Sequence, residues 1–389
     1  MAMVYYTVNG TQVTGYSPYS VPNDDLGWEY TSNWNYGLDL GFWNNRLTAA
    51  FEFYTQHTKD LLLSVTLPAS SGIQSSYLTN IGETKNRGFE LTLNGIILDD
   101  YNGWTWSLGF NFYRNHNEIT QLAGDSDRDI ANGWFVGEAI DAIYDYNKVG
   151  IYQVGEEAIA AAAHSGGKPG DIKVSYNLEE GDPVTFDANG VPSRAINASD
   201  RQIIGTPDGD LQGGFNTNIA WKGFDFGIVG AFKFGGTLVS TLHGSNGYLN
   251  MLSGRRGNVD VDYWTVDNPN NDYPTPGGTL GSQDAPIYAS TLQYFDATYV
   301  KIRTISLGYT LPKNVLGKSG ISKARIYATV TNPFVFFSDF HSETGMDPEP
   351  NSLANQNVAA TGSLQSRVLT IGTNTPSTRN WILGLSLTF

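Results

Sequence analysis

Several features that would point to familiar protein classes are missing from this chain of 389 residues. It contains no cysteine, which excludes disulfide frameworks and thiolate metal sites. No apolar run approaches the ~20 residues that a transmembrane helix needs. Residues 1–7 show neither the basic region nor the apolar core of a secretory signal. We therefore expect that the numbering starts on the mature chain or that its beginning is missing.

Positive charge is also scarce, because 23 Lys and Arg face 38 Asp and Glu, a formal net charge of -15. Nucleic acid is not an expected partner, since phosphate backbones bind basic surfaces. Charged residues of both signs make up only 16% of the chain, whereas it holds 44 Gly, 22 Tyr, 19 Phe and 9 Trp. That composition indicates one large all-β body rather than two ordinary domains.

The end of the chain shows a strict alternation of apolar with small or polar residues. Five large apolar residues occupy every second position and share one face of a strand: Trp381, Leu383, Leu385, Leu387 and Phe389. A chain that stops on the last aromatic of such a face is typical of outer-membrane barrels. We interpret these residues as a lipid-facing strand and as the barrel-assembly signal.

Eight further segments repeat this alternation, and most approach the ~9 to 11 residues with which a tilted strand crosses a bilayer. They lie at 34–42, 47–54, 89–94, 104–112, 215–221, 224–232, 305–311 and 324–330. The apolar phase shifts between Ile302 and Ile305, which indicates a bulge.

The strand count raises a question of closure. Nine strands leave the first and the last running in the same direction, whereas single-chain bacterial barrels close with an even number. Residues 3–9 could supply the tail of a tenth strand. We favour the other interpretation, in which the chain is a piece of a larger barrel.

Connection lengths alternate between short and long. The short ones lie at 43–45, 99–103, 222–223 and 312–322, and the long polar ones at 59–82, 115–210, 235–297 and 335–378. Outer-membrane barrels have short periplasmic turns and long extracellular loops, so the alternation assigns the two sides. Aromatic residues next to the short turns or at the terminus predict a girdle at the membrane interface. They are Phe42, Trp43, Trp104, Trp106, Trp221, Phe224, Tyr309 and Phe389.

Motifs over nearly the whole chain resemble, in order, those of the SusC/RagA family of TonB-dependent outer-membrane transporters. The most specific resembles the family's N-x-G-x-x-x-N-x-G-x-E and comprises Asn80, Gly82, Glu83, Asn86, Gly88 and Glu90. Further family motifs resemble segments 22–29, 150–153, 170–173, 200–205, 299–312 and 345–349.

The resemblance implies an all-β fold: an antiparallel transmembrane β-barrel segment with long extracellular loops, about nine or ten strands of a 22-strand barrel. It also implies that residues 1–389 are the carboxy-terminal portion of such a barrel. The amino-terminal plug domain and the first strands of the family would then be absent from this chain.

By the same resemblance the chain is part of a TonB-energised importer in the bacterial outer membrane and has no enzymatic chemistry. Implied partners are a SusD-like surface lipoprotein, the amino-terminal plug and barrel portion, TonB through that portion, outer-membrane lipid, and an oligosaccharide or peptide ligand. Aromatic rings of the loops can stack on sugars or peptide side chains. The candidate ligand contacts are Trp134, Phe135, Tyr144, Tyr146, Tyr152, Tyr248, Trp264 and Tyr273. Packing within the large loops or against the lipoprotein is the alternative for each.

Many family members carry a compact acidic run in the long loop, and here residues 187–192 interrupt it. The remaining oxygen ligands, Asp187, Asn189 and Asp200, leave two interpretations open: a Ca²⁺ ion in an extracellular loop, or a simple turn. No other cofactor is expected. The five histidines are scattered and no catalytic motif appears, so the residues do not predict an enzyme.

Two other functions stay open. A soluble β-rich carbohydrate-binding or structural protein would bury the apolar strand faces in its core, whereas a barrel exposes them to lipid. A truncated, nonfunctional product of a transporter gene would share the sequence pattern of a working subunit. The exposure of the apolar faces therefore separates the soluble class from the membrane class.

Overall fold

The computed structural model describes residues 2–17, 22–66, 76–122, 126–130, 132–244, 261–270, 272–275, 287–317, 320–354, 368–372 and 374–389. The chain divides into two compact units. The first comprises Met1–Tyr36, Phe53–Gly88 and His116–Ile140, and the second comprises Gly37–Glu52, Phe89–Asn115 and Asp141–Phe389. Each unit is described by itself below.

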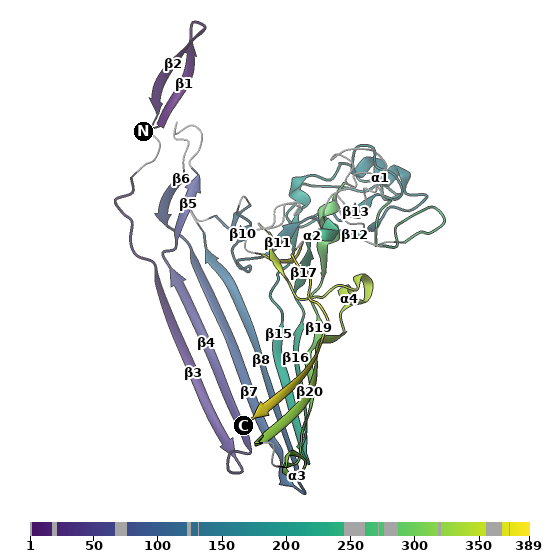
Figure 1. Cartoon of the computed structure of the whole chain (residues 1–389). Coiled ribbons are helices and arrows are strands. Elements are labelled where there is room, and N and C mark those ends of the chain that lie inside the picture. The colour runs from purple at the N-terminus through teal and green to yellow at the C-terminus, as the bar shows by residue number, and fades with distance from the viewer. Residues whose placement is uncertain are drawn as a thin grey trace. The chain divides into compact units, whose positions relative to one another are not determined.

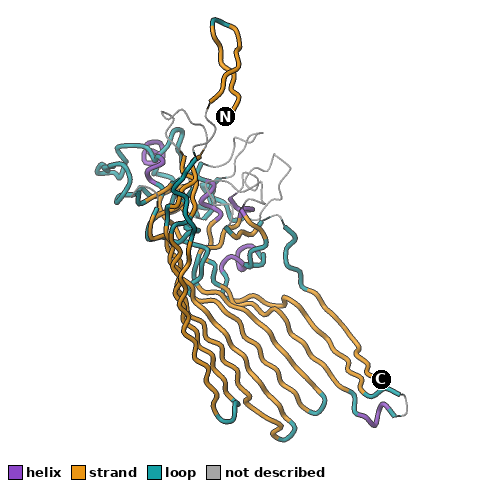
Figure 2. Tube along the Cα trace, turned by 90° about the vertical axis from the view of Figure 1, so that its left-hand side faces the viewer, coloured by secondary structure: helices purple, strands orange, loops and turns teal. Residues whose placement is uncertain are grey.

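Nine strands form one sheet, and their order in the sheet follows their order in the chain. They are β3 (Tyr30–Phe42), β4 (Leu47–Lys59), β7 (Glu83–Tyr101), β8 (Trp104–Gln121), β15 (Leu211–Trp221), β16 (Phe224–Phe234), β19 (Tyr299–Thr310), β20 (Lys323–Phe336) and β23 (Asn380–Thr388). The pairings from β8 to β23 are antiparallel. All nine predicted strands are confirmed, and Figure 2 shows them side by side.

The sheet is open along its two edges. Strands β3 and β23 each have one neighbour, and they do not pair with each other among the residues that the structure describes. This arrangement agrees with the interpretation as a piece of a barrel.

Several strands are longer than the alternation predicts. Strand β7 begins at Glu83 rather than at Phe89, and β20 ends at Phe336 rather than at Val330. Apolar alternation marks only the part of a strand that faces lipid, whereas ladder hydrogen bonds continue into polar sequence. The sequence pattern therefore underestimates the strands at their long-loop ends.

The predicted bulge is confirmed in β19. The register shifts between Val229 and Gly230 on the β16 side and between Ile302 and Thr304 on the β20 side. Arg303 has no partner in either register and is the inserted residue. A bulge changes which face of the sheet the following side chains occupy.

Residues 3–9 do not supply a tenth strand of this sheet. They belong to β1 (Ala2–Val8), which forms an antiparallel hairpin with β2 (Thr11–Ser17) (Figure 1). Asn9 and Gly10 have φ values of 47° and 79°, the left-handed values that a two-residue hairpin turn requires. The Asn-Gly pair is the sequence signal for this hairpin, and the alternation of apolar residues did not reveal it.

The short connections of the second unit lie together at one end of its strands (Figure 1). Two of them are two-residue turns. Asn102 and Gly103 have φ values of 53° and 81°, and Lys222 and Gly223 have 46° and 89°. Such turns match the twist of the flanking strands, which explains why these connections need only two residues.

The long segments carry small elements of their own. These are β5 (Leu62–Thr66), β6 (Ser76–Asn80), β9 (Arg128–Asp129), β10 (Trp134–Phe135), β11 (Ile143–Asp145), β12 (Lys148–Ile151), α1 (Glu157–Ala163), β13 (Ile172–Val174), η3 (Ala198–Asp200), β14 (Gln202–Gly205), β17 (Thr237–Ser240), α2 (Thr241–Gly244), η4 (Ala289–Gln293), β18 (Tyr294–Asp296), α4 (Asp339–Thr344), β21 (Ser352–Leu353) and β22 (Leu369–Ile371). One short helix, α3 (Lys313–Leu316), lies in a short connection. Within the described ranges, no helix is both long enough and apolar enough to cross a membrane.

A tyrosine of β20 packs on a glycine of the terminal strand. Tyr327 of β20 lies directly opposite Gly384 of β23, and a Cβ atom at Gly384 would overlap the Tyr327 ring. The missing side chain is therefore what lets the ring cover the neighbouring backbone.

We expect Gly384→Ala to destabilise the folded protein by about 1–3 kcal/mol, because the new methyl group would displace the Tyr327 ring. The measurement is the midpoint temperature of heat unfolding, for which the shift in gel mobility between the folded and the unfolded protein is the readout. Gly95→Ala in β7 is the matched control, since a Cβ there would meet its nearest atom at an ordinary 3.6 Å. Equal midpoints for the two variants would contradict the expectation.

Candidate functional site: the strand wall and its inner pocket

One face of the sheet exposes large apolar side chains. In β23, Trp381 and Leu383 are 80% and 83% exposed, and in strands with two neighbours Leu307 and Leu108 are 50% and 40% exposed. A soluble protein rarely leaves so many aligned apolar residues in water. The exposure contradicts the soluble alternative, which required a buried core, and it fits a face that contacts lipid.

Aromatic pairs lie at the short-turn ends of neighbouring strands. Trp104 stacks on Trp221 with ring centroids 4.9 Å apart, and Phe224 packs on Tyr309 at 4.4 Å. The residues of each pair stand directly opposite each other in the register. Lys222 Nζ lies 4.8 Å from the Trp221 ring centroid, so a cation meets the aromatic row at the turn. This is the geometry expected of an interfacial girdle.

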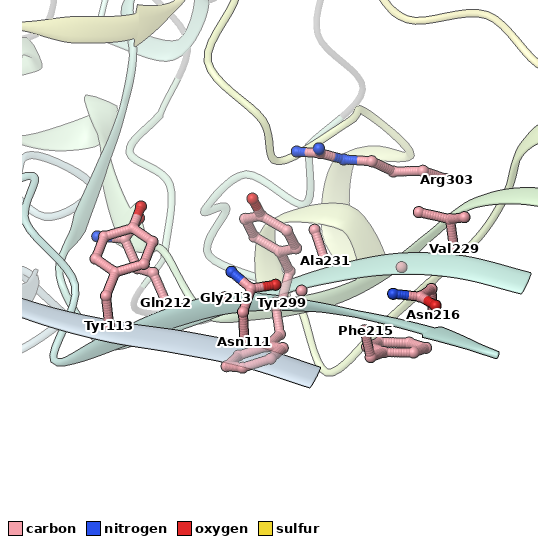
Figure 3. A pocket seen from close by; sticks show the side chains of 13 residues that line it. Asn111, Tyr113, Gln212, Gly213, Phe215, Asn216, Val229, Ala231, Tyr299 and Arg303 are labelled. Carbon is pink, nitrogen blue, oxygen red and sulfur yellow. The ribbon is translucent and has the colours of Figure 1, made fainter. Parts of the chain in front are cut away.

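A pocket of about 420 Å³ lies along β8, β15, β16 and β19 in the second unit. We call it the wall pocket; its lining residues are Asn111, Tyr113, Gln212, Gly213, Gly214, Phe215, Asn216, Val229, Gly230, Ala231, Phe232, Tyr299 and Arg303. Figure 3 shows Asn111, Tyr113, Tyr299 and Arg303 on one side of the strands and Phe215 on the other. The polar side chains therefore belong to the face opposite the apolar one.

Apart from Arg303, which pairs with Glu349, the side chains of the wall pocket that form hydrogen bonds are neutral. Three amide side chains and two tyrosine hydroxyls can each donate and accept, and no carboxylate lines the pocket. Gly214 keeps its floor open, because a Cβ there would lie 3.2 Å from Asn111 Oδ1 and 3.1 Å from the Gly230 carbonyl. The volume is in the range of small-ligand sites.

One lysine and one arginine side chain hold a loop against the strands at the wall pocket. Lys301 is 1% exposed, and its Nζ lies 2.5 Å from Asp347 Oδ2 and 2.6 Å from Glu349 Oε2. Arg303 also pairs with Glu349. We call these four residues the ion cluster. It joins two segments that resemble separate family motifs, 299–312 and 345–349, and so gives both motifs one structural role.

The carboxylates of the ion cluster are held ionised. Burial by itself raises the pKa of Asp347, but hydrogen bonds from Lys301, the Glu349 backbone N–H and Ser377 hold that pKa below its ordinary value. The pKa of Glu349 is lowered against its burial in the same way, by Lys301 and Arg303. Opposite charge and donated hydrogen bonds thus outweigh desolvation at both carboxyl groups.

The family motif around Asn80 fastens loop backbone in the first unit. Asn80 Nδ2 donates to the carbonyls of Gly27, at 3.0 Å, and Asp60, at 2.8 Å. Its Oδ1 accepts from the Gly27 N–H at 2.7 Å. Gly82 follows with φ of 118°, a value that favours glycine. The segment that resembles a second motif, 22–29, is thereby bound to this one.

The remaining residues of this motif lie on β7. Glu83 Oε2 is 2.8 Å from His57 Nε2, and Asn86 Oδ1 is buried without a hydrogen-bond partner. Gly88 is buried, whereas Glu90 is exposed. The structure therefore assigns the motif a fastening role at Asn80 and Glu83 and leaves Glu90 on the surface.

The predicted loop aromatics divide by burial. Tyr152, Trp264 and Tyr273 are buried, and Trp264 Nε1 donates to Gln153 Oε1 at 2.8 Å. Trp264 and Tyr273 belong to one apolar cluster, with Tyr146 packed against it, and Tyr152 belongs to another. This placement supports the alternative interpretation for these three residues, namely packing within the large loops.

The other candidates differ in accessibility. Tyr144 and Tyr146 are half-buried, and Tyr248 lies outside the described residues. Trp134 is half-buried beside a cavity of about 40 Å³, and its Nε1 is buried without a hydrogen-bond partner. Phe135, its neighbour, is buried. Trp134, Tyr144 and Tyr146 remain candidates for ligand contact.

The three candidate cation ligands have other roles in this structure. Asp187 Oδ1 accepts from the backbone N–H groups of Asn189 and Val191, both at 2.8 Å, which closes a turn. Asp200 is fully buried, and its carboxylate accepts two hydrogen bonds from Arg194, at 2.6 Å and 2.8 Å. In the part of the chain that is described, no group of three or more His, Cys, Asp or Glu could hold a metal ion. The turn interpretation has the geometric support.

Sequence reasoning missed the contacts of the wall pocket and the ion cluster. The alternation places Asn111 on the polar face of its strand. The residues of β15 that lie beside it depend on the register, which pairs positions about a hundred residues apart in the chain. Lys301 and Glu349 stood in motifs without an assigned role. The opposite charges of these two motifs were the available signal for an ion pair between them. Charge alone does not say which residues pair.

An apolar face toward lipid, an aromatic girdle and a polar inner face together define the wall of an outer-membrane β-barrel. The comparisons with known proteins give the family: the chain belongs to the TonB-dependent receptors, since the family described as "TonB dependent receptor-like, beta-barrel" matches residues 3–333. Its curated relatives include SusC.

TonB-dependent receptor P3 of Formosa agariphila is 33% identical over 99% of this chain and 37% of its own length. TonB-dependent receptor SusC of Bacteroides thetaiotaomicron is 30% identical over 94% of this chain and 32% of its own length. A structure of the RagAB peptide transporter covers all of this chain with a TM-score of 0.66 at 23% identity, a likeness of fold. The chain thus spans about a third of the length of the curated relatives that it matches.

Lys301→Met should loosen the segment 337–353, because two largely buried carboxylates would lose their shared cation. Removal of one partner from a buried ion pair costs about 3–5 kcal/mol. Hydrogen exchange in that segment is the measurement, and we expect faster exchange than in the parent protein. Lys313→Met, which removes an exposed lysine in a short connection, is the control. Unchanged exchange in Lys301→Met would refute a clamping role.

Low pH should also loosen the segment 337–353. A carboxyl group whose pKa is lowered on folding stabilises the folded state above its unfolded pKa, and this contribution disappears as the pH falls through the folded value. The ordinary values for Asp347 and Glu349 are 3.8 and 4.5, so the clamp is complete at pH 7 and weakens below about 4.5. Exchange of residues 337–353, corrected for the intrinsic rate, should accelerate at pH 3; identical corrected protection at pH 3 and pH 7 would contradict this.

Proposed function

We propose that this chain forms part of the wall and outer loops of a TonB-energised importer of oligosaccharide or peptide nutrients. The observation that carries the proposal is the contrast between the two faces of one sheet. One face exposes aligned apolar side chains, and the other carries the polar wall pocket. A barrel that passes hydrophilic ligands through lipid requires this division.

The proposed importer acts by binding and passage, without covalent chemistry of this chain. Its named relatives are receptors and transporters. Energy from TonB would enter through an amino-terminal plug and barrel portion, which is a partner of this chain in the proposal. The inner face of β8, β15, β16 and β19 would line the route.

Two ligand classes fit the wall pocket. Amide and hydroxyl groups bind the hydroxyl groups of sugars and also the backbone of peptides. The RagAB structure is that of a peptide transporter, whereas the two curated relatives carry names that specify no ligand. Trp134, Tyr144 and Tyr146 are proposed loop contacts, because half-buried rings can still stack on a ligand.

The proposed protein partner is a SusD-like surface lipoprotein. The β1–β2 hairpin supports this proposal, because a two-stranded hairpin is marginally stable alone in water. Tyr5, Tyr6 and Tyr16 of the hairpin are strongly exposed. Tyrosine provides large contact area at interfaces and loses little rotamer freedom. A partner that covers these rings would stabilise the hairpin.

The test is purification from native outer membranes in mild detergent, followed by mass spectrometry of the proteins that accompany the chain. We expect an amino-terminal plug-bearing portion and a surface lipoprotein. Recovery of the chain by itself, or only in the soluble fraction, would overturn the proposed transport function.

A triple variant sharpens the test of the partner. Tyr5→Ser, Tyr6→Ser and Tyr16→Ser together should reduce the lipoprotein that is recovered by at least about tenfold, since interface tyrosines contribute strongly to binding. Tyr101→Ser, at an exposed tyrosine in a short-turn end of β7, should leave the recovery unchanged. Both variants must be recovered from the outer membrane in equal amount. Full lipoprotein recovery with the triple variant would exclude the hairpin as the contact.

A further inference from the structure

Basic side chains gather in the first unit at the long-loop ends of three neighbouring strands. Strands β4, β7 and β8 lie side by side in the sheet, and a long segment joins Lys59 at the end of β4 to the next strands. Five side chains, which we call the basic row, are His57, Lys59, Lys85, Arg87 and His116. Two carboxylates, Glu83 and Glu118, lie among them. A local surplus of cations is unusual for a chain whose net charge is -15.

On β4 the basic row shares the face of the lipid-facing residues. His57 and Lys59 stand four and six positions after Phe53, which is 40% exposed on the apolar face. Even separations along a strand keep one face. Glu83 Oε2 lies 2.8 Å from His57 Nε2, and its Oε1 lies 3.4 Å from Lys59 Nζ. The first residue of β7 therefore points to this face as well.

Strands β7 and β8 continue the basic row on the same face. Lys85 Nζ lies 3.9 Å from Glu118 Oε1, and the ring centroids of Phe89 and Phe112 lie 6.0 Å apart. The two contacts are separated by an even number of residues on each strand, so neither strand changes face between them. Arg87 stands between Lys85 and Phe89 on β7 and therefore also faces outward.

The basic row begins at the level of the lipid headgroups. Phe89 is the last apolar residue on this face of β7, and Arg87 follows it after a rise of ~7 Å along the strand. The headgroup layer extends ~5–7 Å beyond the hydrocarbon on each side of a bilayer. Lys85 reaches further out. Cations at this height can contact headgroup phosphates while their apolar stems stay against the hydrocarbon.

Arg87 has free hydrogen-bonding capacity. Its side chain is exposed and forms neither a hydrogen bond nor an ion pair with any residue that the structure describes. Lys85 is 42% exposed, and its 3.9 Å contact with Glu118 is a loose ion pair. Glu118 is shared with His116, whose Nε2 lies 3.8 Å away. An arginine can donate to two phosphate oxygens at once, and a lysine beside it adds a second positive charge.

The other charges on these strands do not neutralise the basic row. Glu52 and Glu90 each stand next to a lipid-facing phenylalanine in the chain, so they occupy the opposite face. Arg114 precedes His116 by two positions on β8, and its Nη2 lies 3.9 Å from Asp210 Oδ1. Within the first unit, the basic row therefore holds five basic groups against two carboxylates.

Three carboxylates of the adjoining loops have partners of their own. Glu29 Oε1 accepts from a backbone N–H of β5 at 2.7 Å. Asp129 accepts from the backbone N–H of Asn132 at 3.1 Å and from its side chain at 2.8 Å. Asp127 Oδ1 lies 3.3 Å from Arg128 Nε. These acids contribute no ion pair to the basic row.

We propose that the basic row binds the phosphate groups of the outer-leaflet lipid, with Arg87 as the main phosphate ligand and Lys85 and Lys59 beside it. Long loops lie on the outer side of such barrels, so the basic row faces the outer leaflet. Charge complementarity and continuity with the lipid-facing residues favour a lipid, because a soluble partner does not reach the headgroup level beside a bilayer. The inference goes beyond the proposed import function and does not depend on the imported ligand.

The experiment uses the complete transporter purified from outer membranes in mild detergent. Native mass spectrometry measures the dissociation constants of lipid A that carries two phosphates and of the same lipid A after removal of its phosphates. The two probes share their acyl chains, so the ratio of their affinities reports the headgroup. We expect the phosphorylated probe to bind about tenfold or more tightly, since each cation near a headgroup strengthens binding about fivefold.

Paired substitutions assign the preference to the basic row. Arg87→Gln with Lys85→Gln should remove most of it, and neither side chain is buried. Lys313→Gln with Lys323→Gln is the matched control, because it removes two exposed cations at a short connection and should keep the preference. A general loss of folding would weaken both probes alike and leave their ratio unchanged.

Equal affinity of the two probes for the parent protein would overturn the inference. So would a preference that survives in the Arg87 and Lys85 double variant, or one that the control loses to the same extent. A double variant that keeps the lipid preference but loses the surface lipoprotein would assign the basic row to a protein contact instead. The transport function is tested separately, by recovery of the plug-bearing portion and the lipoprotein with the parent chain.

Discussion

The structure depends on one constraint, the absence of water in the hydrocarbon core of a membrane. Every backbone N–H and C=O at that depth must find a partner within the protein, so strands can cross lipid only when each is paired on both sides. From β8 to β20 each strand has a neighbour on both sides, and the ladder is interrupted at the bulge around Arg303. The same constraint divides the side chains, because each strand must present apolar groups outward and is free to present polar groups inward.

Long loops follow from that division. The apolar faces of the nine strands are turned outward and cannot form an internal core, so the buried apolar clusters of the second unit lie in the long segments instead. The ion cluster and the hydrogen bonds of Asn80 attach loop backbone to strand ends or to neighbouring loops. Motifs that are far apart in the chain therefore occur together because they meet in space.

The sequence predicted the strands well because alternation is a local property that lipid enforces at every position. It predicted the bulge for the same reason, since a phase error between Ile302 and Ile305 is visible without coordinates. It missed the β1–β2 hairpin, whose signal was the turn pair Asn9-Gly10 rather than alternation. Burial of Tyr152 and Trp264 could not be read from residue type, because an aromatic ring suits a ligand surface and a loop core equally.

The bulge at Arg303 determines which side chains of β19 face lipid and which face inward. On a strand without a bulge, residues at even separation from Ile305 share its face, so Lys301 and Tyr299 would lie on the lipid face with Ile305 and Leu307. The inserted residue reverses this alternation. Lys301 therefore faces Asp347 and Glu349 instead of the hydrocarbon. A single-codon deletion of Arg303 would leave Lys301 at an odd separation from Ile305 and so on its present face, whereas a deletion at a regular position of the strand would turn every side chain beyond it to the other face. The genetic unit of change in such a wall is therefore the frame of the strand rather than the residue.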